Sequence, residues 1–313
     1  MMDRFDILVV GELNVDLILN QLPSLPEKGK EILAKEMTLT LGSSSAIFAS
    51  NASILGNKVA FLGKIGDDSF GDLVVESLEQ KKVNTEFIIK SATEKTGVTI
   101  VLNYGEDRAM VTYPGAMEAM TLDDIHEDVM LKARHMHVSS IYLQPGIKND
   151  IVKLFEKAKS LGLTTSLDMQ WDPEEKWDID VKRLLPLVDV FLPNETELLA
   201  LTGQKDIESA ILNIKPYINI LAIKMGNKGS RGIEGGKDIL KSPYLNDKVV
   251  DAIGAGDSFN SGFITKYLAG ESLESCLSYG NLAGAVNTTT AGGTGAFVSL
   301  KEFRKTASVR YGA

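Results

Sequence analysis

Residues 249–263 join a glycine-rich turn to a carboxylate, a combination suited to phosphoryl transfer. Two valines lead into Gly254-Ala255-Gly256, and the residues that follow have the pattern of a helix. Glycine permits a sharp turn and close approach of an anion, and the N–H groups at the start of a helix have no partner within it. Asp257 then lies where a phosphate would bind, which suits a base that takes a proton from an attacking hydroxyl. The segment predicts phosphoryl transfer from a nucleotide to an alcohol; the alternative is a turn that only packs the chain.

The composition is that of a globular protein and excludes several other classes. The chain has 313 residues, 44% hydrophobic and 24% charged, a length that suits one large domain or a domain with an appendage. Its net charge of -9 argues against sequence-independent binding of nucleic acid, which needs clustered basic residues. No run approaches the ~20 apolar residues of a membrane span. The single cysteine, Cys276, allows no intramolecular disulfide, so we expect a protein of the reducing cytoplasm.

Two of the three histidines are spaced for a common environment. His135 and His137 are two residues apart on a predicted strand, so both rings would project from one face. This arrangement can form part of a metal site, but no third ligand is near in the sequence. Packing within the strand is therefore the favoured interpretation.

The elements that must position these residues alternate between strands and helices. Apolar runs typical of buried strands occur at 7–10, 59–62, 135–139, 164–167, 188–192 and 220–224. Helical patterns lie between several of them, as at 151–161 and 206–214. This alternation predicts a parallel α/β sheet covered by helices, and ligands of such sheets gather at the carboxyl ends of the strands.

Two regions depart from this alternation and predict a second, small sheet. Residues 31–41 alternate in polarity, and residues 97–103 and 109–113 form a predicted hairpin around residues 104–107. We expect a small antiparallel sheet that stands off the main domain as a lid or a dimer contact. The alternative is ordinary edge strands of the main sheet. In the absence of linkers, we predict one domain over 1–313, with lid strands inserted at about 14–41 and 96–114.

Several ordered motifs together resemble the ribokinase-like, or PfkB-type, sugar kinases over essentially the whole chain. The residues from Asp251 to Phe259 resemble the C-terminal signature of that family. Residues 11–16 resemble the first-strand motif of the family, and residues 42–71 resemble its N-terminal signature. Residues 193–197 resemble its Asn-x-x-Glu motif, and residues 224–229 resemble its nucleotide loop. The resemblance implies a three-layer α/β/α sandwich with a mostly parallel central sheet and a small antiparallel β lid, and a homodimer formed through that lid.

The resemblance also implies roles for individual residues. Asp257 would be the general base, and the N–H groups of Gly254, Ala255 and Gly256 would form an anion hole for the transferring phosphoryl. ATP would be the donor. The residues implied at the nucleotide are Lys224, Gly226 and Gly229, with Asn281 near the adenine, whereas a single Asn on a helix is more often merely exposed.

Metal ions are implied at two places. Asn194 and Glu197 would organise Mg²⁺ and its waters near the phosphates, which suits a hard cation. The same pair also has the spacing of a helix cap, and the two roles are compatible. Asp251 and Gly292 lie where some members of the family bind K⁺ through backbone carbonyls.

The acceptor side carries both matches to the family and departures from it. Residues that match sugar-contacting positions, or lie near them, are Asn14, Asp16, Gly42, Ser43, Ala46 and Gln144. Arg108, in the hairpin, either reaches over an anionic acceptor or is simply solvated. Ser43 replaces the second glycine of the family's usual Gly-Gly pair, Ile47 replaces an expected Asn, and Met117 replaces a residue that is often polar. The acceptor is therefore expected to be bound differently from ribose.

The resulting hypothesis is an ATP-dependent kinase for a free sugar or sugar derivative, of the ribose, fructose or keto-deoxy sugar acid class. A nucleoside kinase of the same family and a non-catalytic sugar-binding protein are the alternatives. A dinucleotide-dependent oxidoreductase is disfavoured because no Gly-x-Gly-x-x-Gly follows the first strand. A Walker-type nucleotidase is disfavoured because its Gly-x-x-x-x-Gly-Lys-Ser/Thr motif does not occur.

Overall fold

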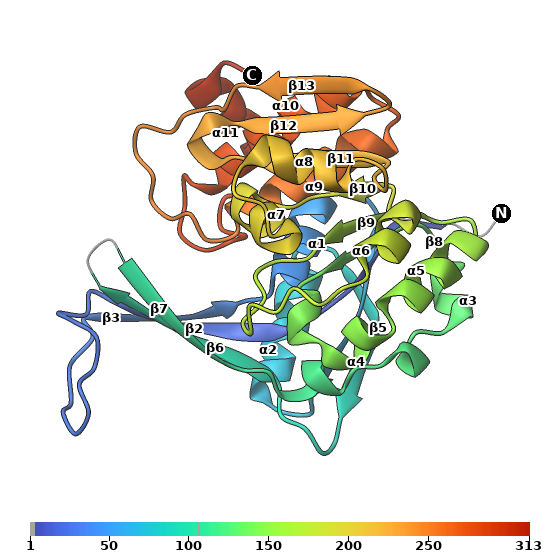
Figure 1. The fold of residues 1–313 in the computed structure, drawn as a ribbon. Helices are drawn as coiled ribbons and strands as arrows, with labels where there is room; N and C mark the ends of the chain where they lie inside the picture. The colour runs from blue at the N-terminus through green and yellow to red at the C-terminus, as the bar shows by residue number, and fades with distance from the viewer. Residues whose placement is uncertain (1–3, 105–106) are drawn as a thin grey trace.

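The computed structural model describes residues 4–104 and 107–313, and in these ranges two β-sheets organise the chain (Figure 1). Nine strands form the larger sheet, and the seven from β11 to β5 are parallel to one another, while β12 and β13 pair antiparallel at one edge. Their order across the sheet is β13 (Lys237–Lys241), β12 (Ser230–Glu234), β11 (Ile220–Lys224), β10 (Val190–Phe191), β9 (Thr164–Asp168), β8 (Ala133–Ser139), β1 (Phe5–Val10), β4 (Val59–Gly66) and β5 (Asn84–Ser91).

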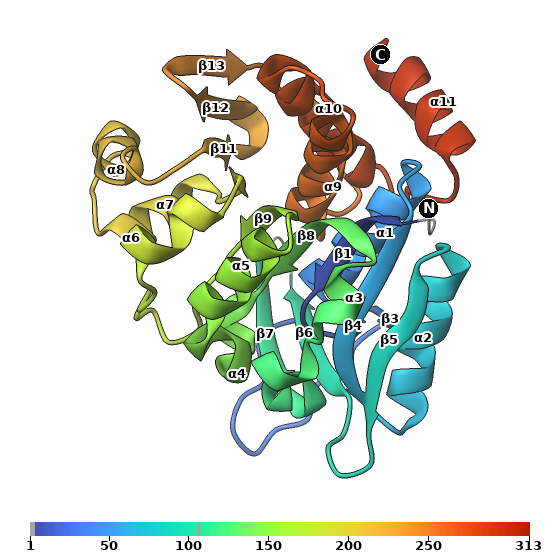
Figure 2. The ribbon, with the colours of Figure 1, turned by 90° about the vertical axis from the view of Figure 1, so that its right-hand side faces the viewer.

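Helices cover both faces of this sheet, because its strands carry apolar side chains on both faces and each face needs cover (Figure 2). In β1, Leu8 and Val10 pack into one apolar core, while Ile7 and Val9 pack into the other. The first core takes residues from α3 (Glu127–Met130), α4 (Pro145–Asn149), α5 (Ile151–Ser160), α6 (Val181–Leu184), α7 (Glu195–Thr202) and α8 (Ile207–Ile214). The second takes residues from α1 (Ser44–Ile54), α2 (Ser69–Gln80), α9 (Ala255–Leu268) and α10 (Leu273–Asn287). The last helix, α11 (Leu300–Tyr311), packs with α10 in a smaller cluster.

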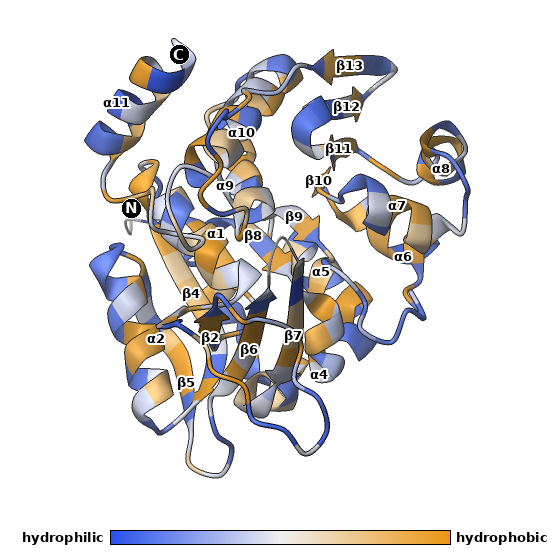
Figure 3. Ribbon diagram, turned by 90° about the vertical axis from the view of Figure 1, so that its left-hand side faces the viewer, coloured by the Kyte–Doolittle hydropathy of each residue, from blue (hydrophilic) through white to orange (hydrophobic). Residues whose placement is uncertain are grey.

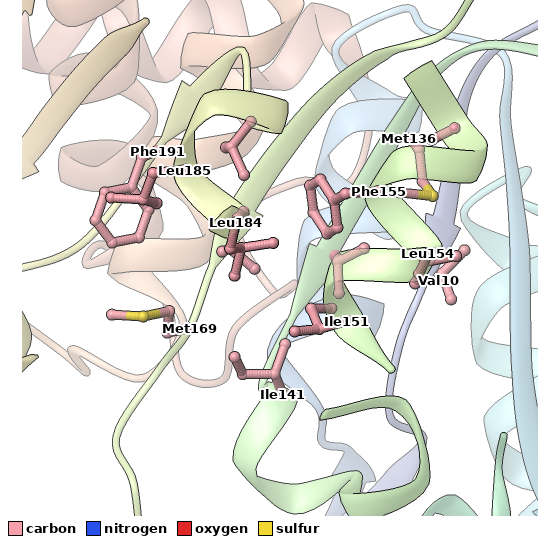
Figure 4. Packing of buried hydrophobic residues seen from close by; sticks show 14 of the residues in the cluster. Val10, Met136, Ile141, Ile151, Leu154, Phe155, Met169, Leu184, Leu185 and Phe191 are labelled. Atoms are coloured by element: carbon pink, nitrogen blue, oxygen red, sulfur yellow. The ribbon is translucent and has the colours of Figure 1, made fainter. Parts of the chain in front are cut away.

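Figure 4 shows part of the first core, between α5 and the sheet. Phe155 and Leu154 of α5 lie near Met136 of β8 and Val10 of β1, and all four side chains are fully buried. The predicted helix at 151–161 is thus confirmed, and its apolar stripe is the face that meets the sheet.

The smaller sheet projects from the main body, at the lower left of Figure 1. Its strands, in spatial order, are β3 (Glu36–Leu41), β2 (Asn14–Asn20), β6 (Gly97–Tyr104) and β7 (Asp107–Tyr113). The two outer pairings are antiparallel, as predicted, but the central pairing of β2 with β6 is parallel. The central pairing is parallel because β2 follows β1 and β6 follows β5, and these two strands of the main sheet run in the same direction.

The two faces of the small sheet have different compositions, because alternate residues of a strand point to opposite sides. On one face Asp16 pairs in register with Thr99, which in turn pairs with Thr112. On the other face lie apolar residues, as Figure 3 shows in part, and five of them are exposed: Met37, Leu39, Ile100, Val111 and Tyr113. One face therefore suits a polar ligand, and the other suits an apolar partner.

Most predicted elements are present, and the differences lie at their ends. The strand predicted at 188–192 is reduced to Val190–Phe191. The predicted alternating segment 31–41 forms a strand only from Glu36, and the residues before it are irregular. The valines at 249 and 250 are exposed and belong to no strand. Part of the predicted hairpin turn, residues 105–106, lies outside the described residues.

Among the helices of the described ranges, none combines the length and the apolar character that a membrane span requires.

Candidate active site

The turn before α9 has a backbone geometry that requires glycine. Gly254 has a φ of 73°, in the left-handed region, and a Cβ at this position would lie 2.6 Å from Cα of Gly293. The helix begins directly after it, at Ala255. The predicted anion hole is thus at a helix N-terminus, although the N–H of Ala255 already donates to the carbonyl of Ala252 at 3.3 Å. That bond is long, so the N–H remains a weakly engaged donor.

Asp257 lies in the first turn of α9 and is nearly buried, with 6% of its surface exposed. Burial, reinforced by the nearby Asp168 carboxylate, raises the pKa of Asp257 well above its usual value, while Lys224 opposes the shift. A carboxylate destabilised in this way accepts a proton more readily than an exposed one. The surroundings of Asp257 therefore suit a general base.

Two cavities meet at this turn. The larger, of about 880 Å³, is lined by Gly254 and Asp257, and the smaller, of about 340 Å³, by Ala255 and Gly256. Ala252 lines both. A group bound in one cavity would therefore meet a group bound in the other beside Asp257. We call them the acceptor cavity and the nucleotide cavity.

The polar face of the small sheet forms one wall of the acceptor cavity. Asp16 anchors this wall, and Nδ2 of Asn14 donates to Oδ1 of Asp16 at 3.1 Å and to the Thr99 hydroxyl at 2.9 Å. Burial raises the pKa of Asp16 to about 6. The wall includes Asp16, Thr99, Val101, Arg108, Met110 and Thr112. Asn14, Asp16 and Arg108 all line this cavity, and Arg108 is exposed, so a contact between Arg108 and an acceptor stays a prediction.

The loop before α1 forms the floor of the acceptor cavity. Ser43, with a φ of 68°, caps α1 by accepting from the N–H of Ala46, and its hydroxyl donates to the carbonyl of Glu12. Gly42 packs directly against the Asp16 carboxylate, because a Cβ at Gly42 would lie only 2.3 Å from Oδ1 of Asp16. Gly42 and Ser43 therefore hold the loop close to the predicted sugar site.

Two predicted acceptor contacts need correction. Gln144 is fully buried, and its amide nitrogen donates to the carbonyls of Ser139 and Ser140, so its side chain satisfies backbone groups instead of lining the cavity. Ala46 is also fully buried, and its methyl group packs in the core beneath α1. Sequence position brought both near the cavity, but neither side chain points into it.

The nucleotide cavity contains the predicted nucleotide residues. Lys224, Gly226, Gly229 and Asn281 all line it, with an apolar wall that includes Tyr244. The amide of Asn281 donates to the carbonyls of Lys241 and Ser242, so this side chain holds the cavity wall in place.

The Asn194 and Glu197 pair forms a complete capping box at the start of α7. The Glu197 N–H donates to Oδ1 of Asn194 at 2.8 Å, and the Asn194 N–H donates to Oε2 of Glu197 at 2.9 Å. Neither residue lines the two cavities. Burial, together with the nearby Asp168, raises the pKa of Glu197 to about 7, while Lys224 opposes the shift. The capping role predicted as one alternative is confirmed.

Asp251 joins the two segments that were predicted to hold a monovalent cation. Its carboxylate accepts from the N–H of Ile253 and from the N–H of Gly292, both at 2.9 Å. The predicted neighbours therefore touch, next to the turn at Gly254.

With this geometry in view, comparison with known proteins decides the family. The model of the pfkB family carbohydrate kinases matches residues 4–299. The chain belongs to this family. An uncharacterized sugar kinase of Archaeoglobus fulgidus is 30% identical over 235 residues, which cover 74% of this chain and 92% of that protein. Ribokinase of Arabidopsis thaliana is 28% identical over 291 residues, or 90% of this chain and 75% of that protein.

The fold agrees with this membership. The structure of A. thaliana ribokinase complexed with ribose and ATP has a TM-score of 0.81 and 25% identity, and the match covers 96% of this chain and 98% of that one. The predicted fold class is confirmed, and this member of the pfkB family is a sugar kinase, which transfers a phosphoryl group to an alcohol.

Three polar residues around Asp257 of this pfkB-family protein were not predicted from the sequence. Asp168 and Gln170 lie at and just after the end of β9, and Asn260 is one turn beyond Asp257 on α9. Lys224 forms an ion pair with Asp168 at 2.6 Å. The rule that ligands gather at the carboxyl ends of parallel strands points to Asp168, because it directly follows the predicted strand at 164–167.

The histidine pair has a packing role, as the sequence favoured. His135 and His137 are fully buried, and both contact the hydroxyl of Ser166 at 2.7 Å. The His137 ring also stacks on Phe48 with a centroid distance of 3.6 Å. Within the described residues no group of three or more metal-binding side chains is present, here or elsewhere.

The departures from the family pattern at Ile47 and Met117 occupy different places. Ile47 lines the acceptor cavity and also packs against Gly254 and Gly293, where a Cβ would meet its side chain at 3.1 and 2.4 Å. Met117 is buried away from the cavity, against Gly97. Ile47 is therefore the departure that changes the surface offered to an acceptor.

Proposed function

We propose that this kinase transfers the γ-phosphoryl group of ATP to a hydroxyl of a free sugar or sugar derivative, with Asp257 as the general base. The observation that carries the proposal is the position of Asp257 and the Gly254–Gly256 turn between the two cavities. In the reaction the acceptor oxygen attacks the γ-phosphorus in line, its proton passes to Asp257, and ADP leaves with the electrons of the broken P–O bond.

The chain's own residues supply position and charge. The N–H groups of the turn and of the N-terminus of α9 would face the anion, which favours charge spread over the phosphoryl oxygens. Asp16 would bind neighbouring hydroxyls of the acceptor, with Asn14 holding its carboxylate. The small sheet would exclude water as a lid, so that ATP is not simply hydrolysed.

Mg²⁺ fits this site as an ion that keeps most of its own waters. Mg²⁺ usually binds through one or two carboxylates, phosphates and water. Glu197 lines neither cavity and accepts from the Asn194 N–H with one oxygen, so its contribution to the ion would be indirect, through water. When bound, the ion would neutralise charge on the phosphates.

We also propose K⁺ beside Asp251 and Gly292, where their contact brings two backbone turns together. Replacement of KCl by NaCl in the activity assay tests this proposal. That the whole chain forms one cytoplasmic kinase domain stays a prediction.

The outer face of the lid is proposed to bind a second copy of this chain. Met37, Leu39, Ile100, Val111 and Tyr113 expose apolar surface on one side of the same small sheet. Exposed strands and apolar faces of this kind need cover, and a two-fold pair would cover both copies at once.

The alternatives differ in what the acceptor cavity holds. Its volume of about 880 Å³ leaves room for a nucleoside as well as a free sugar. A non-catalytic sugar-binding protein would have no use for a base at Asp257. The buried carboxylate at the junction of the cavities therefore favours a kinase.

Coupled ADP release with Mg-ATP tests the proposal across ketoses, aldoses, sugar acids and nucleosides. We expect acceptor-dependent ADP release that Asp257→Ala lowers by about 10²- to 10⁴-fold, the usual contribution of a general base. The variant should still bind ATP, as measured by calorimetry. Asp128→Ala, at an exposed position on α3, is the matched control and should keep full activity. Near-normal turnover by Asp257→Ala would refute the assignment of the base.

A further inference from the structure

Two buried carboxylates lie side by side at the active site, and only one of them has a role in the proposed reaction. Asp168, at the end of β9, is fully buried and contributes to the electrostatic field at Asp257. Two neighbouring carboxylates in a buried site tend to share a proton unless other groups distinguish them. The surroundings of Asp168 and Asp257 make that distinction.

Three side-chain donors converge on one oxygen of Asp168. Oδ2 accepts from Nζ of Lys224 at 2.6 Å and from Nε2 of Gln170 at 3.0 Å. The amide of Asn260 also donates to this oxygen. Asn260 reaches it because it is three residues after Asp257, on the same face of α9. Asp168 is therefore held as the partner of a buried lysine and has no free position for an acceptor hydroxyl at Oδ2.

Gln170 connects this ion pair to the base. Its Nε2 lies 3.0 Å from Oδ2 of Asp168 and 3.0 Å from Oδ1 of Asp257, so one amide group donates to both carboxylates. Gln170 also lines the acceptor cavity, and its backbone has a φ of 61°, in the left-handed region. That strained conformation turns the side chain back between β9 and α9.

We propose that Gln170 is a positioning residue that ties Asp257 to the Asp168–Lys224 ion pair and turns the second oxygen of Asp257 toward the acceptor hydroxyl. The proposal rests on the proposed function, in which Asp257 is the base. One N–H of Gln170 stabilises the ionised form of each carboxylate, so the two need not share a proton. Asp168 stays paired with Lys224, and Asp257 is left to take the proton of the acceptor.

A change at Gln170 would alter the protonation of Asp257 in a defined direction. Loss of the N–H donor destabilises the ionised form of Asp257 and raises its pKa, and the base must be ionised to act. The acid limb of the rate profile would therefore move to higher pH. The charged groups that act on Asp257 would remain in place: Asp168 on β9, Lys224 on β11 and Glu12 after β1. The other charged residues that line the same cavity are Asp16, Arg108, Glu118, Lys148, Asp172 and Glu174.

The test is a carboxyl titration of protein labelled with ¹³C-aspartate, followed by NMR, in which the Asp257 signal is identified by its loss in Asp257→Asn. In Gln170→Met, which keeps the length of the side chain but lacks the donor, the Asp257 midpoint should rise by about one pH unit or more. The acid limb of kcat should move equally, with both KM values within about threefold of the wild type. Gln80→Met, at an exposed position of α2, should change neither quantity.

The outcomes separate this inference from the proposed function. An active enzyme whose Asp257 midpoint is the same in Gln170→Met and the wild type would overturn the role of Gln170. A raised midpoint in a protein that releases no ADP with any acceptor would support the link and refute the kinase reaction proposed above. If Gln170→Met does not fold, Gln170→Asn takes its place, since Asn tolerates the left-handed backbone and its shorter side chain cannot bridge both carboxylates. An unchanged midpoint in that variant would equally overturn the inference.

Discussion

Asp16, a partly buried carboxylate at the acceptor cavity, shows how a single residue lowers stability in favour of a binding site. Asp16 has one side-chain donor in Asn14, and burial raises its pKa from an ordinary 3.8 to about 6. Between these two values the folded protein binds more protons than the unfolded chain, so stability falls as the pH rises. Above pH 6 the full penalty of an ionised, partly buried Asp16 is present.

We therefore expect Asp16→Asn to be more stable than the wild type at neutral and alkaline pH. The gain should be about 1–3 kcal/mol at pH 8, because each unit of pKa shift corresponds to about 1.4 kcal/mol, and about half as large at pH 5. Chemical denaturation at the two pH values measures both quantities. A variant less stable than the wild type at pH 8 would contradict this account, whereas acceptor binding should weaken in any case.

At the scale of elements, α9 depends on a glycine at each end for different reasons. Gly254 and Gly270 have nearly equal φ angles, 73° and 74°. A Cβ at Gly254 would collide with Gly293, whereas a Cβ at Gly270 would meet nothing within 4 Å. The pair thus separates the effect of backbone conformation from the effect of close packing.

Gly270→Ala should lower the free energy of unfolding by about 1–2 kcal/mol, the usual penalty of a left-handed conformation. Gly254→Ala should lower it further and also reduce kcat, because the turn that is proposed to bind the phosphoryl group must move. Urea unfolding and ADP release measure the two effects. Equal losses in both variants, with activity retained, would show that the contact with Gly293 does not matter.

The sequence predicted elements better than contacts. The strand at 220–224 and the helix after Gly254 follow from local patterns, and the structure has both. Gln170 gave no signal, because its role depends on a left-handed backbone and on two carboxylates from β9 and α9. Gln144 was predicted to contact the acceptor, but its amide donates to the carbonyl of Ser139 instead. Sequence position places a residue near a cavity but does not determine where its side chain points.

At the scale of the whole molecule, the lid is proposed to contribute to both the reaction and the assembly. Its polar face lines the acceptor cavity, and its outer face exposes Ile100 and Val111, which pair in register. Closure over a substrate and contact with a second copy would then involve the same four strands.

Light scattering after size-exclusion chromatography should therefore give a dimer at micromolar concentration. Ile100→Lys should give a monomer, because a charge would be buried at the centre of the proposed contact. Val309→Lys, on an α11 position that is 79% exposed, is the matched control and should remain a dimer. A monomeric wild type would contradict the proposal.

The alternation of the lid strands separates two sets of positions that are interleaved in the chain. Along β7, Arg108, Met110 and Thr112 face the acceptor cavity, while Val111 and Tyr113 face outward. Point substitutions in the first set can retune acceptor choice without touching the outer surface, and the reverse also holds. Insertion or deletion of a single residue exchanges the two faces beyond it. The lid strands should therefore tolerate substitutions, in evolution as in redesign, but not insertions or deletions within the strands.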